Sequence, residues 1–319
     1  MNGNESIRWA RLSIVSNSLL AGLKIVIGLS TGSVSVIAEG LHSLMDLVAS
    51  IITFMAVHIS AKEADRTHHF GHGKFENVAG LVEGLLIFAG GALIIWEALP
   101  KLFSDKGPET LGWGLAVMAL SSGVNFAVSA KLFKVAKVTH SPALEADAWH
   151  LRTDVYTSAG VLGGLVLIKL TGIAIFDPIV ALLVACFIMK AAYDITLEGF
   201  SHMVDVTIPP HEMEKLDAIL DRHGARYLEY HELRARKSGP QRFIDLHLVM
   251  PRDLTLQKVH ELCDVIEKEI EGGLPNSHVL IHPEPCAETC KECGLATGAG
   301  HRRCTQYSDM SDAPEKTGP

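Results

Sequence analysis

Six apolar segments, each long enough to cross a lipid bilayer, constrain this chain more than any other feature of its sequence. A membrane-spanning helix needs about 20 mostly apolar residues, and it satisfies its own backbone polar groups inside lipid. The predicted spans lie near residues 12–30, 33–59, 78–99, 111–133, 147–170 and 174–200. Apolar residues make up 48% of the chain, which also favours a membrane protein. The formal net charge of -8 argues against nucleic acid as a partner.

The distribution of basic residues predicts the orientation of the spans. Basic residues before the first span and in the second and fourth connections are Arg8, Arg11, Lys62, Arg66, Lys74, Lys131, Lys134 and Lys137. The opposite side carries Lys101 and Lys106. Because cytoplasmic loops carry the excess of positive charge, six spans place both termini in the cytoplasm. No signal-peptide cleavage pattern precedes the first span, so we expect it to remain in the mature protein.

After residue 205 the composition becomes that of a soluble domain. Apolar periodicity and turn residues predict, in order, a helix over 211–222, strands over 226–236 and 242–250, a helix over 255–271 and a strand over 277–282. This αββαβ order predicts a two-layer α+β domain of the ferredoxin-like type. We therefore expect a transmembrane domain at 1–205, a cytoplasmic metal-binding domain at 206–286 and a cysteine-containing, disordered tail at 287–319.

Two predicted spans each carry a His and an Asp four residues apart, His42 with Asp46 and His150 with Asp154. On a helix this spacing places both side chains on one face. Two such faces together offer two imidazoles and two carboxylates, a tetrahedral set that suits Zn²⁺. A single His or Asp in a membrane helix serves an interhelical hydrogen bond about as often as it serves a functional site. The repeated pattern disfavours the hydrogen-bond alternative. These four residues are the intramembrane quartet.

Four other charged residues interrupt the apolar segments, namely Lys24, Glu83, Glu97 and Lys190. We expect the two lysines to extend toward the membrane surface or to pair with a neighbouring carboxylate. A substrate role is not expected for either lysine.

The connection after the second span contains Asp65, His68 and His72, the loop triad, which can converge on one metal ion. The alternative is a polar, histidine-rich surface loop. The predicted soluble domain carries a third set, the cytoplasmic cluster of His231, His247, His260, His282 and Glu284. Single histidines on strands more often pack or face solvent, but five candidates in one small domain favour metal binding.

The tail carries a set of cysteines at Cys286, Cys290, Cys293 and Cys304. Their spacing suits a soft-metal or zinc site, but it lacks the paired repeat of a strong zinc motif. The alternative is a reduced, unstructured tail, because a cytoplasmic location argues against disulfides.

The chain resembles the cation diffusion facilitator family of metal/proton antiporters over about residues 7–286. The resemblance is carried by several short sequence motifs that occur in a fixed order. The matching phrases are Gly32–Ser35, Phe70–Lys74, Arg234 with Ser238–Pro240 and Arg242-Phe243, and His282–Pro285. Within this family the chain resembles the bacterial zinc and ferrous-iron efflux transporters. The resemblance implies integral membrane localisation, in a bacterial inner membrane, and contact with lipid.

The resemblance also assigns roles to the residues above. It implies that the intramembrane quartet is the transport site, that the loop triad is a further metal site, and that the cytoplasmic cluster is a binuclear regulatory site. It implies a homodimer with an interlock of Lys74 and Asp205 near the membrane surface. Metal in the cytoplasmic domain would then tighten the dimer and bias the transporter.

The chain departs from these relatives at two ligand positions. His42 stands where the bacterial relatives carry Asp, and Glu284 also stands where they carry Asp. A histidine at position 42 removes a carboxylate and supplies a nitrogen donor, which should favour Zn²⁺ over Cd²⁺ and harder cations. The longer Glu284 leaves open whether this residue bridges two metals.

The leading functional hypothesis is a secondary active Zn²⁺/H⁺ antiporter that exports metal from the cytoplasm. The alternatives are the same mechanism with Fe²⁺, Mn²⁺ or Co²⁺ as cargo, and a metal sensor without transport. An intramembrane metalloprotease is rejected because it needs H-E-x-x-H. The nearest approaches, at His211, His231 and His260, do not complete that motif.

Overall fold

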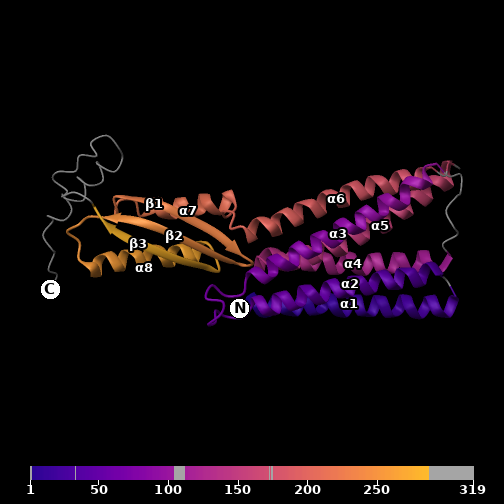
Figure 1. Cartoon of the computed structure of the whole chain (residues 1–319), viewed down its shortest axis with the longest axis horizontal. Helices are drawn as coiled ribbons and strands as arrows, with labels where there is room; N and C mark the ends of the chain where they lie inside the picture. Colours follow the sequence, from indigo (N-terminus) through magenta and orange to yellow (C-terminus); the bar gives the residue numbers. More distant parts are fainter. Residues whose placement is uncertain (1, 33, 104–111, 172, 174, 287–319) are drawn as a thin grey trace. The chain divides into compact units, whose positions relative to one another are not determined.

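The structure is a computed structural model that describes residues 2–32, 34–103, 112–171, 173 and 175–286. The chain folds into two compact units, Met1–Val204 and Asp205–Pro319. The first unit is a bundle of long helices and the second is a small α+β unit (Figure 1).

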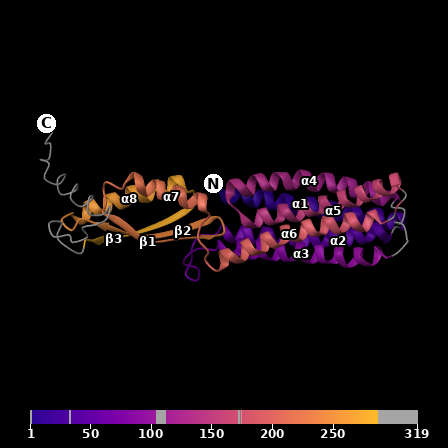
Figure 2. The same cartoon turned by 90° about the horizontal axis from the view of Figure 1, so that it is seen from above.

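The described part of the first unit contains six long helices that run along one common direction (Figures 1 and 2). Their bounds are α1 Asn2–Thr31, α2 Val34–Ser60, α3 Lys74–Lys101, α4 Gly112–Thr139, α5 Pro142–Thr171 and α6 Phe176–Met203. Each helix coincides with one predicted span, but α1, α3 and α5 begin earlier than predicted and α4 ends later. The helices extend beyond the predicted spans because polar residues at their ends can continue the helical backbone hydrogen bonds outside the lipid. The sequence prediction used hydropathy, which detects only the apolar middle of each helix.

Helix α5 differs from the other five helices in its hydropathy. Among the described residues, α1, α2, α3, α4 and α6 contain stretches long and apolar enough to cross a membrane, and α5 is outside that set. The charged residues Glu145, Asp147, Arg152 and Asp154 lie along its first half. α5 packs against α2, α3, α4 and α6. Neighbouring helices therefore cover polar groups of α5 that would be costly in contact with lipid.

Small residues bring two pairs of helices into close contact. A Cβ atom on Gly84 of α3 would lie 2.5 Å from Oγ1 and 3.0 Å from the backbone nitrogen of Thr196 on α6. A Cβ atom on Gly40 of α2 would lie 2.8 Å from the side chain of Ile25 on α1. Glycine at these positions allows backbones to approach as membrane helices commonly do. The outer faces of the bundle carry exposed apolar side chains such as Leu19 and Trp96, as a lipid-contacting surface requires.

The second unit has the order α7 Pro210–Arg222, β1 Glu229–Ser238, β2 Gln241–Met250, α8 Leu256–Gly273 and β3 Ser277–Pro285. The strand order is β1-β2-β3, with β1 antiparallel and β3 parallel to β2. Both helices lie on the same side of the sheet (Figure 2). This confirms the predicted αββαβ order and its two layers.

Strand β2 shows why one face of the sheet is a core and the other is open. Its side chains alternate, so Ile244, Leu246 and Leu248 are buried against apolar residues of α7 and α8. The intervening positions, including Asp245 and His247, lie on the opposite face. Asp245 and His247 are therefore presented away from the helices.

A buried ion pair joins the start of β2 to α7. Arg242 is 1% exposed, and its Nε and Nη2 donate to the two carboxylate oxygens of Glu212 at 2.8 and 2.5 Å. Nη1 of Arg242 donates to the backbone oxygen of Pro275 at 2.6 Å. Bidentate pairing of this kind fixes both side chains, so Arg242 anchors the strand to the helix layer.

Candidate metal centre

The intramembrane quartet is assembled by α2 and α5, which carry its two His/Asp pairs. His150 Nε2 lies 3.2 Å from Asp46 Oδ1, and His42 Nε2 lies 3.8 Å from the same oxygen. His42 Nε2 also lies 3.9 Å from Asp154 Oδ1, across the two helices. Ligand atoms of His42, Asp46 and Asp154 all lie within 4.8 Å of one another. Three members of the quartet thus converge on one point, and His150 adjoins them through its contact with Asp46, so nitrogen and oxygen donors come from both helices.

The quartet is unequally accessible. The side chain of Asp46 is 7% exposed and that of His150 is 12% exposed, whereas that of His42 is 61% exposed. A donor set that is buried on one side and open on the other allows an ion to enter without unfolding of the bundle.

Two residues that the sequence did not single out as site residues contact the quartet. Asn125 of α4 donates from Nδ2 to Asp154 Oδ2 at 3.3 Å. Glu83 of α3 places Oε2 3.6 Å from His150 Nδ1. The only sequence signal for Glu83 was a charge within an apolar segment, and Asn125 gave no signal. Asn125 and Glu83 both meet residues of another helix, α5, so their contacts depend on how the helices pack.

Lys24 pairs with a carboxylate, one of the two alternatives that the sequence left open. Its ammonium group donates to Glu39 Oε2 at 3.1 Å and to Ser43 Oγ at 2.9 Å. Both partners lie on α2, Glu39 about one turn before His42 and Ser43 directly after it. This pair joins α1 to α2 beside the quartet.

The loop triad forms a compact group between α2 and α3. Asp65 Oδ1 lies 3.5 Å from His68 Nδ1, and Asp65 Oδ2 lies 3.5 Å from His72 Nε2. Hydrogen bonds from the hydroxyl and backbone N–H of Thr67 and from the backbone N–H of His68 lower the pKa of Asp65. Gly71 adopts a φ of 74°, a conformation that favours glycine and turns the chain back toward Asp65. The carboxylate is thus ionised and held between two imidazoles.

The open face of the sheet gathers most of the cytoplasmic cluster. His231, His247 and His282 are direct register partners on β1, β2 and β3, so they form one row across the sheet. Glu284 lies beside this row, with carboxylate oxygens 2.8 Å from His247 Nδ1 and 3.4 Å from His231 Nε2. His282 Nε2 lies 3.8 Å from the same carboxylate. A change of register in β1 follows His231, where Glu232 adopts a φ of 48°.

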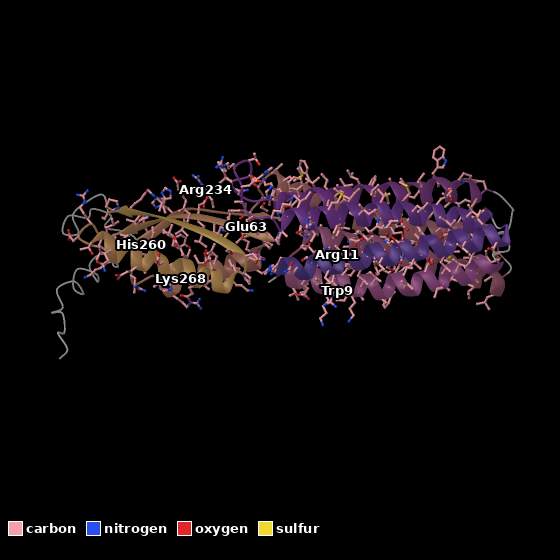
Figure 3. The ribbon with its side chains drawn as sticks, turned by 90° about the horizontal axis from the view of Figure 1, so that it is seen from below. Trp9, Arg11, Glu63, Arg234, His260 and Lys268 are labelled. Carbon is pink, nitrogen blue, oxygen red and sulfur yellow. The ribbon has the colours of Figure 1, made fainter. Side chains whose placement is uncertain are left out.

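His260 lies apart from this row, on α8, with a side chain that is 74% exposed (Figure 3). Its Nδ1 lies 3.6 Å from Asp264 Oδ1, four residues along the same helix. The helix layer covers the opposite face of the sheet from His247. The structure of one chain therefore brings together four members of the predicted cluster and leaves His260 outside it.

The structure describes both interlock residues and one of the four cysteines of the tail set. Lys74 Nζ donates to the backbone oxygen of Met203 at 3.4 Å, and Asp205 Oδ1 accepts from Arg236 Nη1 at 3.0 Å. Their mutual pairing remains a prediction. Cys286 is buried beside Leu228. The other predicted tail ligands, Cys290, Cys293 and Cys304, lie outside the described residues.

These features define a helical membrane protein with a group of His and Asp side chains between its helices and a small α+β domain that gathers further His and Glu side chains. The chain belongs to the cation diffusion facilitator family. The family model for the cation efflux transmembrane domain matches residues 10–204, and the model for the cytoplasmic domain of cation efflux proteins matches residues 208–286. The predicted family and fold class are confirmed.

Individual proteins agree with this assignment. The cation-efflux pump FieF of Yersinia pestis (strain Pestoides F) is 32% identical over 293 residues, which cover 89% of this chain and 96% of the pump. An uncharacterized transporter of Synechocystis sp. is 32% identical over 277 residues, covering 87% and 89%. A solved structure of the zinc form of CzrB is 38% identical and covers 26% of this chain and 96% of that one, with a TM-score of 0.25. The two family models and the FieF relative place the chain in a family of cation efflux transporters.

Proposed function

We propose that this protein exports Zn²⁺ from the cytoplasm in exchange for protons, with the intramembrane quartet as its transport site. The observation that carries the proposal is the meeting of two imidazoles and two carboxylates between α2 and α5, with His150 Nε2 at 3.2 Å from Asp46. Two nitrogen and two oxygen donors suit tetrahedral Zn²⁺. Family membership supports cation efflux as the direction of transport.

Proton exchange follows from the chemistry of the donors. A metal ligand must be deprotonated, so binding of the cation releases protons from the same atoms. Histidine ordinarily titrates near pH 6.5, which places this competition in the physiological range. A quartet exposed alternately to the two sides of the membrane then carries metal outward and protons inward. His42 and His150 are the residues at which the exchange takes place.

The choice of cargo rests on donor softness. Imidazole donors favour zinc over Mg²⁺ or Mn²⁺, whereas a set richer in carboxylates accepts harder ions. The same mechanism with Fe²⁺, Mn²⁺ or Co²⁺ as cargo is the nearest alternative, because affinity order alone does not decide selectivity in a cell. The second alternative is a metal sensor that does not transport.

We further propose that the protein works as a homodimer in a bacterial inner membrane, with both termini in the cytoplasm. Support comes from the cytoplasmic-domain match and from the efflux pumps of bacterial relatives. The loop triad and the cytoplasmic cluster are regulatory metal sites in this proposal. An exposed His260 on α8 is available to a partner subunit, which would complete a cluster that one chain leaves without it.

The test is metal uptake into proteoliposomes that contain a fluorescent metal reporter. Zn²⁺, Cd²⁺, Fe²⁺ and Mn²⁺ are compared with and without a pH gradient, for the wild type and for His42→Asp. We expect the wild type to move Zn²⁺ in exchange for protons and the variant to gain Cd²⁺ transport. Preference of the wild type for Fe²⁺ or Mn²⁺ would show that the cargo is wrong, and no movement under any gradient would favour the sensor.

A further inference from the structure

Glu83 is a fully buried carboxylate whose two oxygens face different partners. The residue lies on α3 and is 0% exposed. Oε1 accepts a hydrogen bond from Thr53 Oγ1 on α2 at 2.8 Å. Oε2 is directed toward His150 Nδ1 on α5 at 3.6 Å. One carboxylate thus connects three helices at the level of the intramembrane quartet.

The contact with His150 accounts for two buried atoms that otherwise have no partner. Neither Glu83 Oε2 nor His150 Nδ1 makes a hydrogen bond in the described part of the chain. In that part of the chain, His150 is also the one His, Lys or Arg whose side-chain nitrogen lies within ion-pair distance of Glu83. An unpaired carboxylate oxygen in a low-dielectric interior is costly. If Glu83 served only to accept the hydrogen bond from Thr53, the free-energy cost of burying Oε2 would remain uncompensated.

The two nitrogens of His150 have separate tasks. Nε2 faces Asp46 at 3.2 Å, on the side where the cation is expected. A neutral imidazole carries one proton, and the partner of one nitrogen decides which nitrogen keeps its lone pair. Histidines that bind metals almost always donate the N–H of the other nitrogen to a carboxylate or carbonyl, which fixes the ring and its tautomer.

We propose that Glu83 is a positioning residue that accepts the Nδ1–H of His150 and thereby keeps the Nε2 lone pair directed at the transported cation. The inference rests on the proposed function of the quartet. Glu83 does not coordinate the ion in this role. Its effect passes through the orientation of one ligand, so it should set the affinity for the cation rather than the capacity to transport it.

The test compares the half-saturating Zn²⁺ concentration for uptake into proteoliposomes in four proteins. They are the wild type, Glu83→Gln, Glu83→Asp and the control Glu76→Gln. Glu76 is a second buried acid on α3, but its side chain accepts a hydrogen bond from Ser141, and within the described residues it makes no hydrogen bond or ion pair with the quartet. Loss of such a supporting carboxylate typically weakens metal binding by about 10–100-fold.

We expect Glu83→Gln to raise the half-saturating concentration by about 10–100-fold, with a smaller change in maximal rate. Glu83→Asp retains the negative charge but places the carboxylate farther from His150 Nδ1, so this variant should recover part of the Zn²⁺ affinity. Glu76→Gln should match the wild type. An unchanged half-saturating concentration in Glu83→Gln, beside active wild type, would overturn the proposal. Inactive wild type would instead contradict the proposed function.

A direct binding measurement separates orientation from transport. Titration calorimetry of the purified full-length protein with Zn²⁺ gives a component that Asp46→Asn removes, and that component belongs to the quartet. Glu83→Gln should weaken this component alone. If Glu83→Gln does not fold, Thr53→Val keeps the carboxylate but removes the hydroxyl that holds it at 2.8 Å. A weakened component in Thr53→Val would support the proposal, and an unchanged one would overturn it.

Discussion

Asp46→Asn should separate transport from folding more sharply than any other single change in the quartet. The side chain is 7% exposed and lies 3.2 Å from His150 and 3.8 Å from His42. Asparagine has the same shape, so it leaves no cavity and its amide group can still form a hydrogen bond with His150. It removes the negative charge that faces both imidazoles and the cation.

The two expected magnitudes differ widely. A hydrogen bond to a charged group contributes about 1.5–3 kcal/mol to stability, and a neutral one contributes about 1 kcal/mol. We therefore expect the free energy of unfolding of Asp46→Asn to be only about 1 kcal/mol below that of the wild type. For a domain of this size that corresponds to a fall in Tm of about 2–4 °C. Loss of a supporting partner of a ligand already weakens metal binding by about 10–100-fold. Loss of a charged ligand should therefore raise the half-saturating Zn²⁺ concentration by at least about 100-fold.

Initial rates of Zn²⁺ uptake into proteoliposomes, measured across a range of Zn²⁺ concentrations, test the transport part. Thermal unfolding in detergent tests the folding part on the same preparation. Glu76→Gln is the matched control, because it also replaces a buried acid by its amide. Unchanged half-saturation in Asp46→Asn would refute the assignment of Asp46 as a ligand. A large fall in Tm would show instead that Asp46 is mainly structural.

Three further predictions concern the parts outside the membrane. Arg242→Met should lower the free energy of unfolding of the α+β unit by about 3–5 kcal/mol, because Glu212 is left buried without its partner; hydrogen exchange of β2 amides in the intact protein measures this, and Arg242→Met with Glu212→Leu should lose less. The hydrogen bond from His223 lowers the pKa of Glu269 below its usual 4.5, so its stabilisation is complete above that pH and is lost as the pH falls through the lowered value; acid unfolding of Glu269→Gln should therefore depend less on pH in this range. Removal of residues 287–319 should leave Zn²⁺ uptake largely intact, and complete loss would show that the tail takes part in transport.

The patterns that depend on local spacing could be predicted from the sequence. The His-x-x-x-Asp phrases place both side chains on one helical face whatever the rest of the chain does. The alternation in β2 likewise placed His247 on the face opposite Leu246 and Leu248. In both cases the geometry is a property of one element, so a few residues determine it.

Contacts between distant elements could not be predicted in this way. Glu83 was visible only as a charge in an apolar helix, and its approach to His150 depends on how α3 packs beside α5. His260 was grouped with the strand histidines by residue type. His260 lies on α8, in the helix layer that packs on the face of the sheet opposite His247, so it does not join the row within one chain. Residue type indicates chemistry, but packing decides which groups meet.

A polar seam along α2 shows how the quartet is tied into the bundle. Glu39, Ser43, Asp46, Ser50 and Thr53 recur at alternating intervals of four and three, so they share one face over about 21 Å at 1.5 Å per residue. Partners from α1, α5 and α3 meet this face in turn. They are Lys24 at Glu39 and Ser43, His150 at Asp46, Asn17 and Asp147 at Ser50, and Glu83 at Thr53. Because each position bonds to another helix, α2 cannot rotate without breaking several of these contacts together. In the proposed alternating-access mechanism, α2 should therefore move as a rigid element that carries His42 and Asp46 together, rather than reorient these two residues one at a time.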